Sequence, residues 1–272
     1  YIVYTREGDG GFDNGRVVTD NSLIVNQKQD VIYSYRVTAI NAGGESFPSE
    51  TLAVCQSSDA KSTVMIVNGF DRLSAAECRE DGFHNEFDSG VAYLRDVAFI
   101  GEQRVHDISK RREKSEPRAF GVSFSNHAGK IVGGNSFDYP YLHGKSLKVA
   151  GCSFYSSSVA AVESGEVDLS GFNVVDLVLG KQRTTTIGRG VAESKYQCFS
   201  GDLQRVISDY LKSNGALFVS GAYIGTDLCG SKTSREVDVQ FARDILHVSY
   251  MGNGGCVTKL DYVTTASRAA ER

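Results

Sequence analysis

The residues best suited to chemistry are carboxylates, a histidine and a tyrosine that lie in polar, glycine-flanked segments. A carboxylate and a histidine together can donate and accept protons during cleavage of a glycan or an amide. The sequence therefore predicts an acid–base group made of Asp138, His143, Tyr223 and Asp227. A structural role is the alternative: Asp138 can cap the turn before Pro140, and His143 can donate to a backbone carbonyl.

Further polar residues follow apolar runs that are typical of buried parallel strands. In open parallel sheets, ligands bind at the carboxyl ends of the strands. The segments 68–72, 180–183 and 220–227 meet this condition, and two more polar residues lie in glycine-flanked segments elsewhere. The predicted ligand-binding residues are Asp71, Asp88, Lys145, Gln182 and Gly221.

One of these segments has the glycine spacing of a nucleophile elbow, with Gly221 and Gly225 on either side of Tyr223. An elbow carries serine or cysteine at the central position, and a tyrosine, with a pKa of about 10, is a much poorer nucleophile. Cys229 facing His247 is the alternative that an amidotransferase would need.

The elements that position these residues change character at Ser62. Continuous apolar runs at 63–67, 172–179 and 216–220 predict buried strands. We therefore expect an α/β domain with a parallel sheet at 62–272.

Apolar residues at helical spacing predict an amphipathic helix between the last two of these strands. Its expected start is a cap at Ser200 or Asp202, and its expected stop is Asn214-Gly215. A strand, a helix and a strand in this order form a crossover unit. A further helix is expected at 237–246.

Residues 1–56 follow the pattern of short strands instead, at 1–4, 22–26, 33–40 and 51–54. Apolar and polar residues alternate in the third of these runs, as in a half-buried strand.

This pattern resembles the last strands of a fibronectin type III sandwich, with Tyr33 in the place of its corner tyrosine. Such a sandwich needs about 90 to 100 residues, so we expect the chain to begin inside a domain. The predicted domains are the C-terminal part of a fibronectin type III domain at 1–56, a linker at 57–61 and the α/β domain at 62–272.

Composition argues against several classes of function. A net charge of −4 and a pI near 5.8 disfavour nucleic-acid binding, and no apolar run approaches the length of ~20 residues that spans a bilayer. The six cysteines form no CxxC pair, and the carboxylates of the glycine-rich loop 8–15 do not follow the order of a calcium loop, so a turn is favoured there. No metal or cofactor is expected.

Residues 172–228 resemble the class I glutamine amidotransferase-like fold, which implies a flavodoxin-like sheet with helices on both faces. In that family the turn after the strand carries a catalytic cysteine, followed much later by a His–Glu pair. This chain has Tyr223 at the turn and a lone His247. The resemblance therefore predicts the fold without amidotransferase activity.

Most of residues 62–250 also resemble secreted proteins of Bacteroidetes that are labelled xanthan lyase or fibronectin type III domain-containing protein. The segments that carry this resemblance are 66–72, 88–90, 136–141, 143–145, 179–182 and 219–227. It implies a secreted, periplasmic or cell-surface protein, with glycan or peptidoglycan and other domains of the same polypeptide as partners. Two functions follow: a module associated with glycan or peptidoglycan processing, or a hydrolase acting on these polymers.

Overall fold

A computed structural model describes residues 1–46, 48–70, 138–180, 182–187, 192–230 and 234–252 of the protein, together with some short strands between them. The short strands are β8 (Ala76–Glu77), β9 (Arg79–Glu80), β10 (Asn85–Glu86) and β11 (Gly133–Gly134). The chain divides into two compact units, Tyr1–Ile66 with Asp71–Ser156 and Val67–Phe70 with Ser157–Arg272. Each unit is described by itself. The domain boundaries expected from the sequence stay a prediction.

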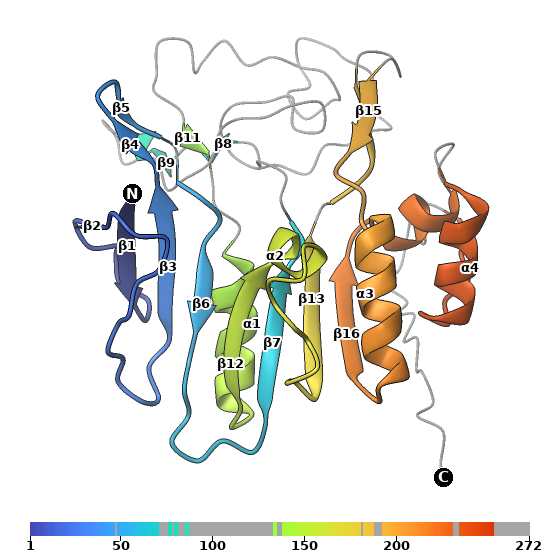
Figure 1. Ribbon diagram of the computed structural model, residues 1–272, viewed down its shortest axis with the longest axis horizontal. Helices are drawn as coiled ribbons and strands as arrows, with labels where there is room; N and C mark the ends of the chain where they lie inside the picture. Colours follow the sequence, from blue (N-terminus) through green and yellow to red (C-terminus); the bar gives the residue numbers. More distant parts are fainter. Residues whose placement is uncertain are drawn as a thin grey trace. The chain divides into compact units, whose positions relative to one another are not determined.

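The first unit contains an antiparallel sheet in the order β2-β1-β3-β6 (Figure 1). Its strands are β1 (Ile2–Glu7), β2 (Arg16–Val17), β3 (Tyr33–Thr38) and β6 (Leu52–Val54). A hairpin of β4 (Ile40–Asn41) and β5 (Gly44–Glu45) follows β3. The prediction of a strand at 22–26 is wrong. Strand β1 pairs with β2 on one edge and with β3 on the other, so it has no free edge with which residues 22–26 could pair.

The two faces of this sheet are covered unequally. The strand register places Val3 beside Val37 and Tyr35 beside Leu52, so these side chains share one face. Ser34, which points to the opposite face, is fully buried although it is polar, whereas Tyr35 and Val37 are only half-buried. The apolar face of the sheet is therefore the more open one.

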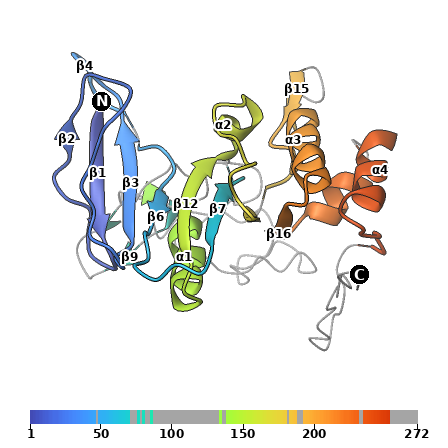
Figure 2. The ribbon, with the colours of Figure 1, turned by 60° about the horizontal axis from the view of Figure 1, so that its bottom comes forward.

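Helix α1 (Tyr139–Val149) packs against strand β12 (Ser153–Ser158), as both ribbon views show (Figures 1 and 2). Pro140 lies in the first turn of the helix, where backbone N–H groups have no partner within the helix, so the N–H that proline lacks is not needed. At Gly144 a Cβ would lie 2.2 Å from Cζ of Phe154, so the close approach requires glycine. Cys55 and Phe154 exchange backbone hydrogen bonds of 3.0 and 2.9 Å, which joins β12 to the end of β6.

The second unit contains two parallel strands, β13 (Val174–Gly180) and β16 (Ala216–Gly221). The last two residues of strand β7 (Thr63–Asn68) also belong to this unit. In the sequence, the chain passes from β13 through a hairpin of β14 (Thr185–Ile187) and β15 (Ala192–Lys195) and then through helix α3 (Gly201–Lys212) to β16. Helix α3 runs beside β16 (Figures 1 and 2). The expected parallel crossover, and with it the α/β class, is confirmed.

The ends of α3 follow the expected signals. The Ser200 side chain accepts the backbone N–H of Leu203 at 3.0 Å and caps the helix. Asn214 adopts a left-handed conformation with φ of 65°, and a Cβ at Gly215 would lie 2.3 Å from the Tyr210 ring. Both the predicted start and the predicted stop of this helix are confirmed.

The other helical elements of the second unit are α2 (Val159–Glu163), the π-helical turn η3 (Thr226–Gly230) and α4 (Glu236–Asp244). The last of these confirms the helix expected near 237–246. In the part of the chain that the structure describes, no helix is long and apolar enough to cross a membrane.

Candidate functional site

The residues expected to do chemistry fall into two groups. Asp138, His143 and Lys145 belong to the first unit, at and along α1, whereas Gln182, Gly221, Tyr223 and Asp227 belong to the second. Asp71 and Asp88 lie outside the described residues.

Asp138 stands at the N-cap position of α1, but its side chain makes no capping bond. Its carboxylate instead pairs with the guanidinium of Arg6 on β1 at 2.5 Å, and the two side chains are only 21% and 14% exposed. The same guanidinium donates to the Ser34 hydroxyl at 2.9 Å. Asp138 therefore ties the start of the helix to the sheet, which is a structural task.

Arg6 is also part of a stack of cations and aromatic rings that the sequence analysis missed. Its guanidinium carbon lies 5.0 Å from the ring centre of Phe12 and 4.6 Å from that of Tyr141. The guanidinium carbon of Arg36 lies 4.1 Å from the ring centre of Phe12 and 5.5 Å from that of Tyr4. Tyr4 and Arg6 lie two residues apart on β1 and therefore share one face of the strand. This spacing was the signal for the stack, because the face of an aromatic ring attracts a cation.

Lys145, another predicted site residue, lies on α1 near this stack. The Tyr141 hydroxyl donates a hydrogen bond to Asp9, and Lys145 Nζ lies 3.5 Å from the same carboxylate. Burial, together with this hydrogen bond, raises the pKa of Tyr141 to about 12. The hydrogen bond from Tyr141 and the charge of Lys145 lower the pKa of Asp9. Lys145 thus holds the glycine-rich loop against α1, and His143 lies half-buried on the same helix.

In that glycine-rich loop the turn interpretation is confirmed. The Asp13 carboxylate accepts the backbone N–H groups of Thr5 and Gly15, both at 2.9 Å, as in an Asx turn. Among the described residues, no group of histidine, cysteine, aspartate and glutamate side chains is placed to hold a metal ion.

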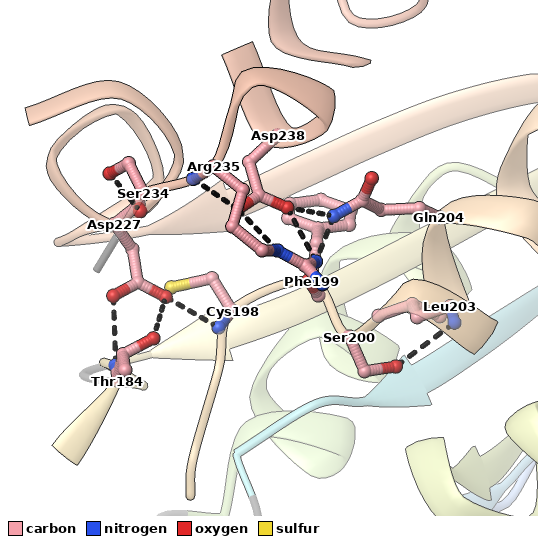
Figure 3. A network of polar contacts seen from close by, with 10 residues as sticks. All are labelled: Thr184, Cys198, Phe199, Ser200, Leu203, Gln204, Asp227, Ser234, Arg235 and Asp238. Carbon is pink, nitrogen blue, oxygen red and sulfur yellow. Dashed lines mark hydrogen bonds and ion pairs between the residues drawn. The ribbon is translucent and has the colours of Figure 1, made fainter. Parts of the chain in front are cut away.

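Asp227 of the second unit is buried and bonded to fixed donors (Figure 3). One carboxylate oxygen accepts the backbone N–H of Thr184 at 2.8 Å, and the other accepts the Thr184 hydroxyl at 2.9 Å and the N–H of Cys198 at 2.8 Å. The Cys198 thiol donates to the carbonyl of Gln182 at 3.0 Å. This geometry makes Asp227 the anchor of three chain segments, since its acceptor positions point at the backbone.

The network in Figure 3 continues to the start of α4. Asp238 is bonded by Arg235 at 2.8 Å and by Gln204 of α3 at 2.8 Å. Burial alone would raise the pKa of Asp238, but the hydrogen bonds from Arg235 and Gln204 outweigh it, so the pKa is lowered. These contacts join α3 to α4.

The elbow-like turn after β16 carries Tyr223, and Cys229 follows in η3. Arg183 lies 5.0 Å from the centre of the Tyr223 ring, and the turn continues into the π-helix η3. Gly221 is required sterically, since a Cβ would lie 2.9 Å from Cβ of Leu179. Burial raises the pKa of the Cys229 thiol, whereas a nucleophilic cysteine needs a lowered pKa.

A groove of about 610 Å³ lies on the open, apolar face of the sheet in the first unit. We call it the tyrosine groove, because Tyr1, Tyr35 and Tyr155 line it. Tyr1 is 55% exposed and Tyr155 is 46% exposed, so both rings are accessible to a ligand. Tyr155 belongs to β12, directly after the buried Phe154.

The rest of the tyrosine groove is lined by aliphatic side chains of the sheet and by the segment after β2. The aliphatic side chains of the sheet come from β1, β3 and β6, and they are Val3, Val37, Leu52 and Val54. The irregular segment after β2 contributes the polar side chains Asp20, Asn21, Ser22 and Gln27, together with the apolar side chains Val18, Leu23 and Val25. Gln27 Nε2 donates to the Tyr35 hydroxyl at 2.6 Å, which fixes the carboxamide at the groove wall. Concave sites of this kind, apolar with a few polar groups, are typical of ligand binding.

Four aromatic residues of α1 and β12 could together offer a stacking surface to a sugar, and they are Tyr139, Tyr141, Phe154 and Tyr155. The structure separates this set. Phe154 and Tyr141 are buried, and Tyr155 is the member that lines the groove.

Comparison with family models, with curated proteins and with solved structures gives no match to this chain.

Proposed function

We propose that the chain is a glycan-binding module of a secreted or cell-envelope protein that is associated with glycan or peptidoglycan processing, without amidotransferase activity of its own. The bonded state of two candidate acid–base carboxylates is the observation that carries this proposal, because Asp138 pairs with Arg6 and Asp227 accepts three hydrogen bonds. Aromatic rings offer flat apolar surface to the C–H faces of a sugar, and amide or carboxylate groups bond its hydroxyls. The exposed ring of Tyr155 on β12 offers such a surface.

The proposal includes a finer assignment of the fold. Tyr33 supports a fibronectin type III-like sandwich, because its hydroxyl accepts the backbone N–H of Lys28, a few residues upstream, at 3.4 Å. A bond of this kind defines the tyrosine corner of such sandwiches. The parallel pair β13 and β16 with its crossover helix α3 supports a flavodoxin-like arrangement of the second part.

Location and context are proposed on the resemblance to secreted Bacteroidetes proteins. The proposed location is secreted, periplasmic or at the cell surface, and the proposed partners include other domains of the same polypeptide.

A hydrolase acting on peptidoglycan or polysaccharide is the second candidate, and its geometry is less favourable. An acid–base carboxylate must reach the substrate. Asp138 is in an ion pair with Arg6, and Asp227 accepts three hydrogen bonds from Thr184 and Cys198. The described carboxylates of this set therefore serve the fold.

The test is retention of the purified chain on insoluble glycans: peptidoglycan sacculi, chitin and cellulose. We expect retention on at least one of them, and we expect Tyr155→Ala to weaken it about three- to tenfold, the value of one aromatic contact. Phe218→Ala is the matched control, since Phe218 is 58% exposed and lies in the other unit.

Retention on none of these glycans would refute the proposal. Equal losses in the Tyr155 and Phe218 variants would show that the tyrosine groove is not the site.

A further inference from the structure

We propose that the protein converts its own Asn14 to aspartate and isoaspartate, with the Asp13 carboxylate as the general base. The reaction is a cyclisation between Asn14 and Gly15, which lie next to each other in the glycine-rich loop 8–15. It needs a nucleophile, a carbonyl group and a base within the loop, and water as its co-reactant.

The nucleophile is the backbone nitrogen of Gly15. Its N–H donates to Asp13 Oδ1 at 2.9 Å, so the proton that must leave this nitrogen already points at a carboxylate oxygen. The same oxygen accepts the backbone N–H of Thr5 at 2.9 Å, which fixes the carboxylate on the turn. A base within hydrogen-bond reach of the proton that it removes has the geometry of general base catalysis.

The carbonyl group is the side-chain carboxamide of Asn14. This residue is exposed, so its side chain can rotate toward the following nitrogen and water can reach it. Closing a five-membered ring brings the two reacting atoms together within one short segment of chain. Gly15 has no Cβ to shield its nitrogen, and its φ of +78° and the Ile2 side chain, 2.4 Å from the place of a Cβ, require glycine there.

The reaction consumes water and releases ammonia, with no change in oxidation state. The Gly15 nitrogen bonds to Cγ of Asn14 as its proton passes to Asp13. The Cγ–Nδ2 bond then breaks, Asp13 returns the proton to the departing nitrogen, and ammonia leaves a succinimide ring. Water opens this ring at either carbonyl, which gives aspartate or isoaspartate at position 14.

Other asparagine–glycine pairs of the described chain have a backbone carbonyl in the place of the base. At the end of α3, the N–H of Gly215, which follows Asn214, donates to the carbonyl of Tyr210 at 3.2 Å. A carbonyl accepts a hydrogen bond but does not take up the proton at neutral pH. Asn68, which also precedes a glycine, is only 3% exposed, so water is kept from it. Asn14 should therefore react before these two residues.

The experiment incubates the purified chain at neutral pH and maps aspartate and isoaspartate by tandem mass spectrometry of its peptides. In the folded chain we expect conversion of Asn14 to be about tenfold or more faster than conversion of Asn214. In concentrated urea the turn is lost, and the two asparagines should then react at similar rates. This comparison needs no variant.

Asp13→Asn tests the base. The carboxamide oxygen of asparagine can accept the same two N–H groups, but it does not take up a proton at neutral pH. We expect this variant to slow the conversion of Asn14 about tenfold or more, with the fold checked by circular dichroism. Asp20→Asn is the control, because Asp20 is an exposed aspartate of the following segment, and it should leave the rate unchanged.

Two results would overturn the proposal. The first is conversion of Asn14 in the folded chain that is no faster than that of Asn214. The second is unchanged or faster conversion in Asp13→Asn, which would show that the hydrogen bond only protects the Gly15 nitrogen.

Discussion

At the scale of single residues, Arg6 carries more contacts than its position in a short strand suggests. It pairs with Asp138, donates to Ser34, and lies between the rings of Phe12 and Tyr141. A guanidinium suits this place, because its flat faces stack on rings while its edge donates hydrogen bonds.

The ion pair between Arg6 and Asp138 should contribute measurably to stability. Asp138→Asn leaves the partly buried guanidinium without its counter-charge, and we expect the free energy of unfolding to fall by about 1.5–3 kcal/mol. Urea-induced unfolding measures this. Glu7→Gln is the control, because its ion pair with Lys28 is 51% and 73% exposed and such pairs contribute about 0–1 kcal/mol. Equal effects of the two variants would contradict the structural role of Asp138.

Tyr141 should make stability depend on alkaline pH. Its folded-state pKa of about 12 lies above the ordinary value of 10.0. Protonated Tyr141 therefore contributes stability that is fully present below pH 10 and is lost as the pH rises through 12. We expect the wild type to lose roughly 2 kcal/mol more than Tyr141→Phe over this range.

The measurement for Tyr141 is urea unfolding at several alkaline pH values, with tyrosinate absorbance followed in parallel. Parallel pH profiles of the wild type and Tyr141→Phe would contradict the prediction.

At the scale of elements, the packing of α1 on β12 depends on one missing side chain. Gly144→Ala improves helix propensity by about 1 kcal/mol, but its Cβ would collide with Phe154, and overpacking costs about 1–3 kcal/mol. We expect a lower midpoint of unfolding. Gly201→Ala, also in a helix, meets no atom within 4 Å and should leave stability unchanged or raise it. Thermal unfolding of both variants checks the sign, and a stabilised Gly144→Ala would overturn the packing described here.

Elements with local signals could be predicted from the sequence. The helix α3 has its cap at Ser200, its apolar stripe and its stop at Asn214 within a dozen neighbouring residues, so its bounds follow from short-range rules. The expected strand at 22–26 failed for the opposite reason. Strand formation there needed an edge of β1 that β2, a strand of two residues without an apolar pattern, had taken.

The site was harder to predict than the elements. Asp138, Lys145 and Asp227 have the residue types of catalytic groups, but their partners Arg6, Asp9 and Thr184 lie far away in the sequence. The tyrosine groove escaped prediction because alternation in β3 shows that its two faces differ, not which face other segments cover. The structure buries the polar face and leaves the apolar face open.

At the scale of the whole molecule, the two units hold their polar groups differently. In the second unit, Asp227 and Asp238 are bonded to backbone and side-chain donors, and they stabilise loops and helix ends. In the first unit, the polar stack around Arg6 closes one side of the sheet, and the tyrosine groove lies on the other. The described surface that suits a ligand thus belongs to the first unit.

Neighbouring residues of β12 have opposite surroundings. Phe154 is fully buried beneath Gly144, and the next residue, Tyr155, is 46% exposed in the groove. Because side chains alternate along a strand, the ring in the core sets the direction of the ring at the surface. The packing of Phe154 in the core and the orientation of Tyr155 at the surface therefore depend on one short stretch of backbone. A substitution that disturbs the packing of Phe154 would also change the orientation of the Tyr155 ring.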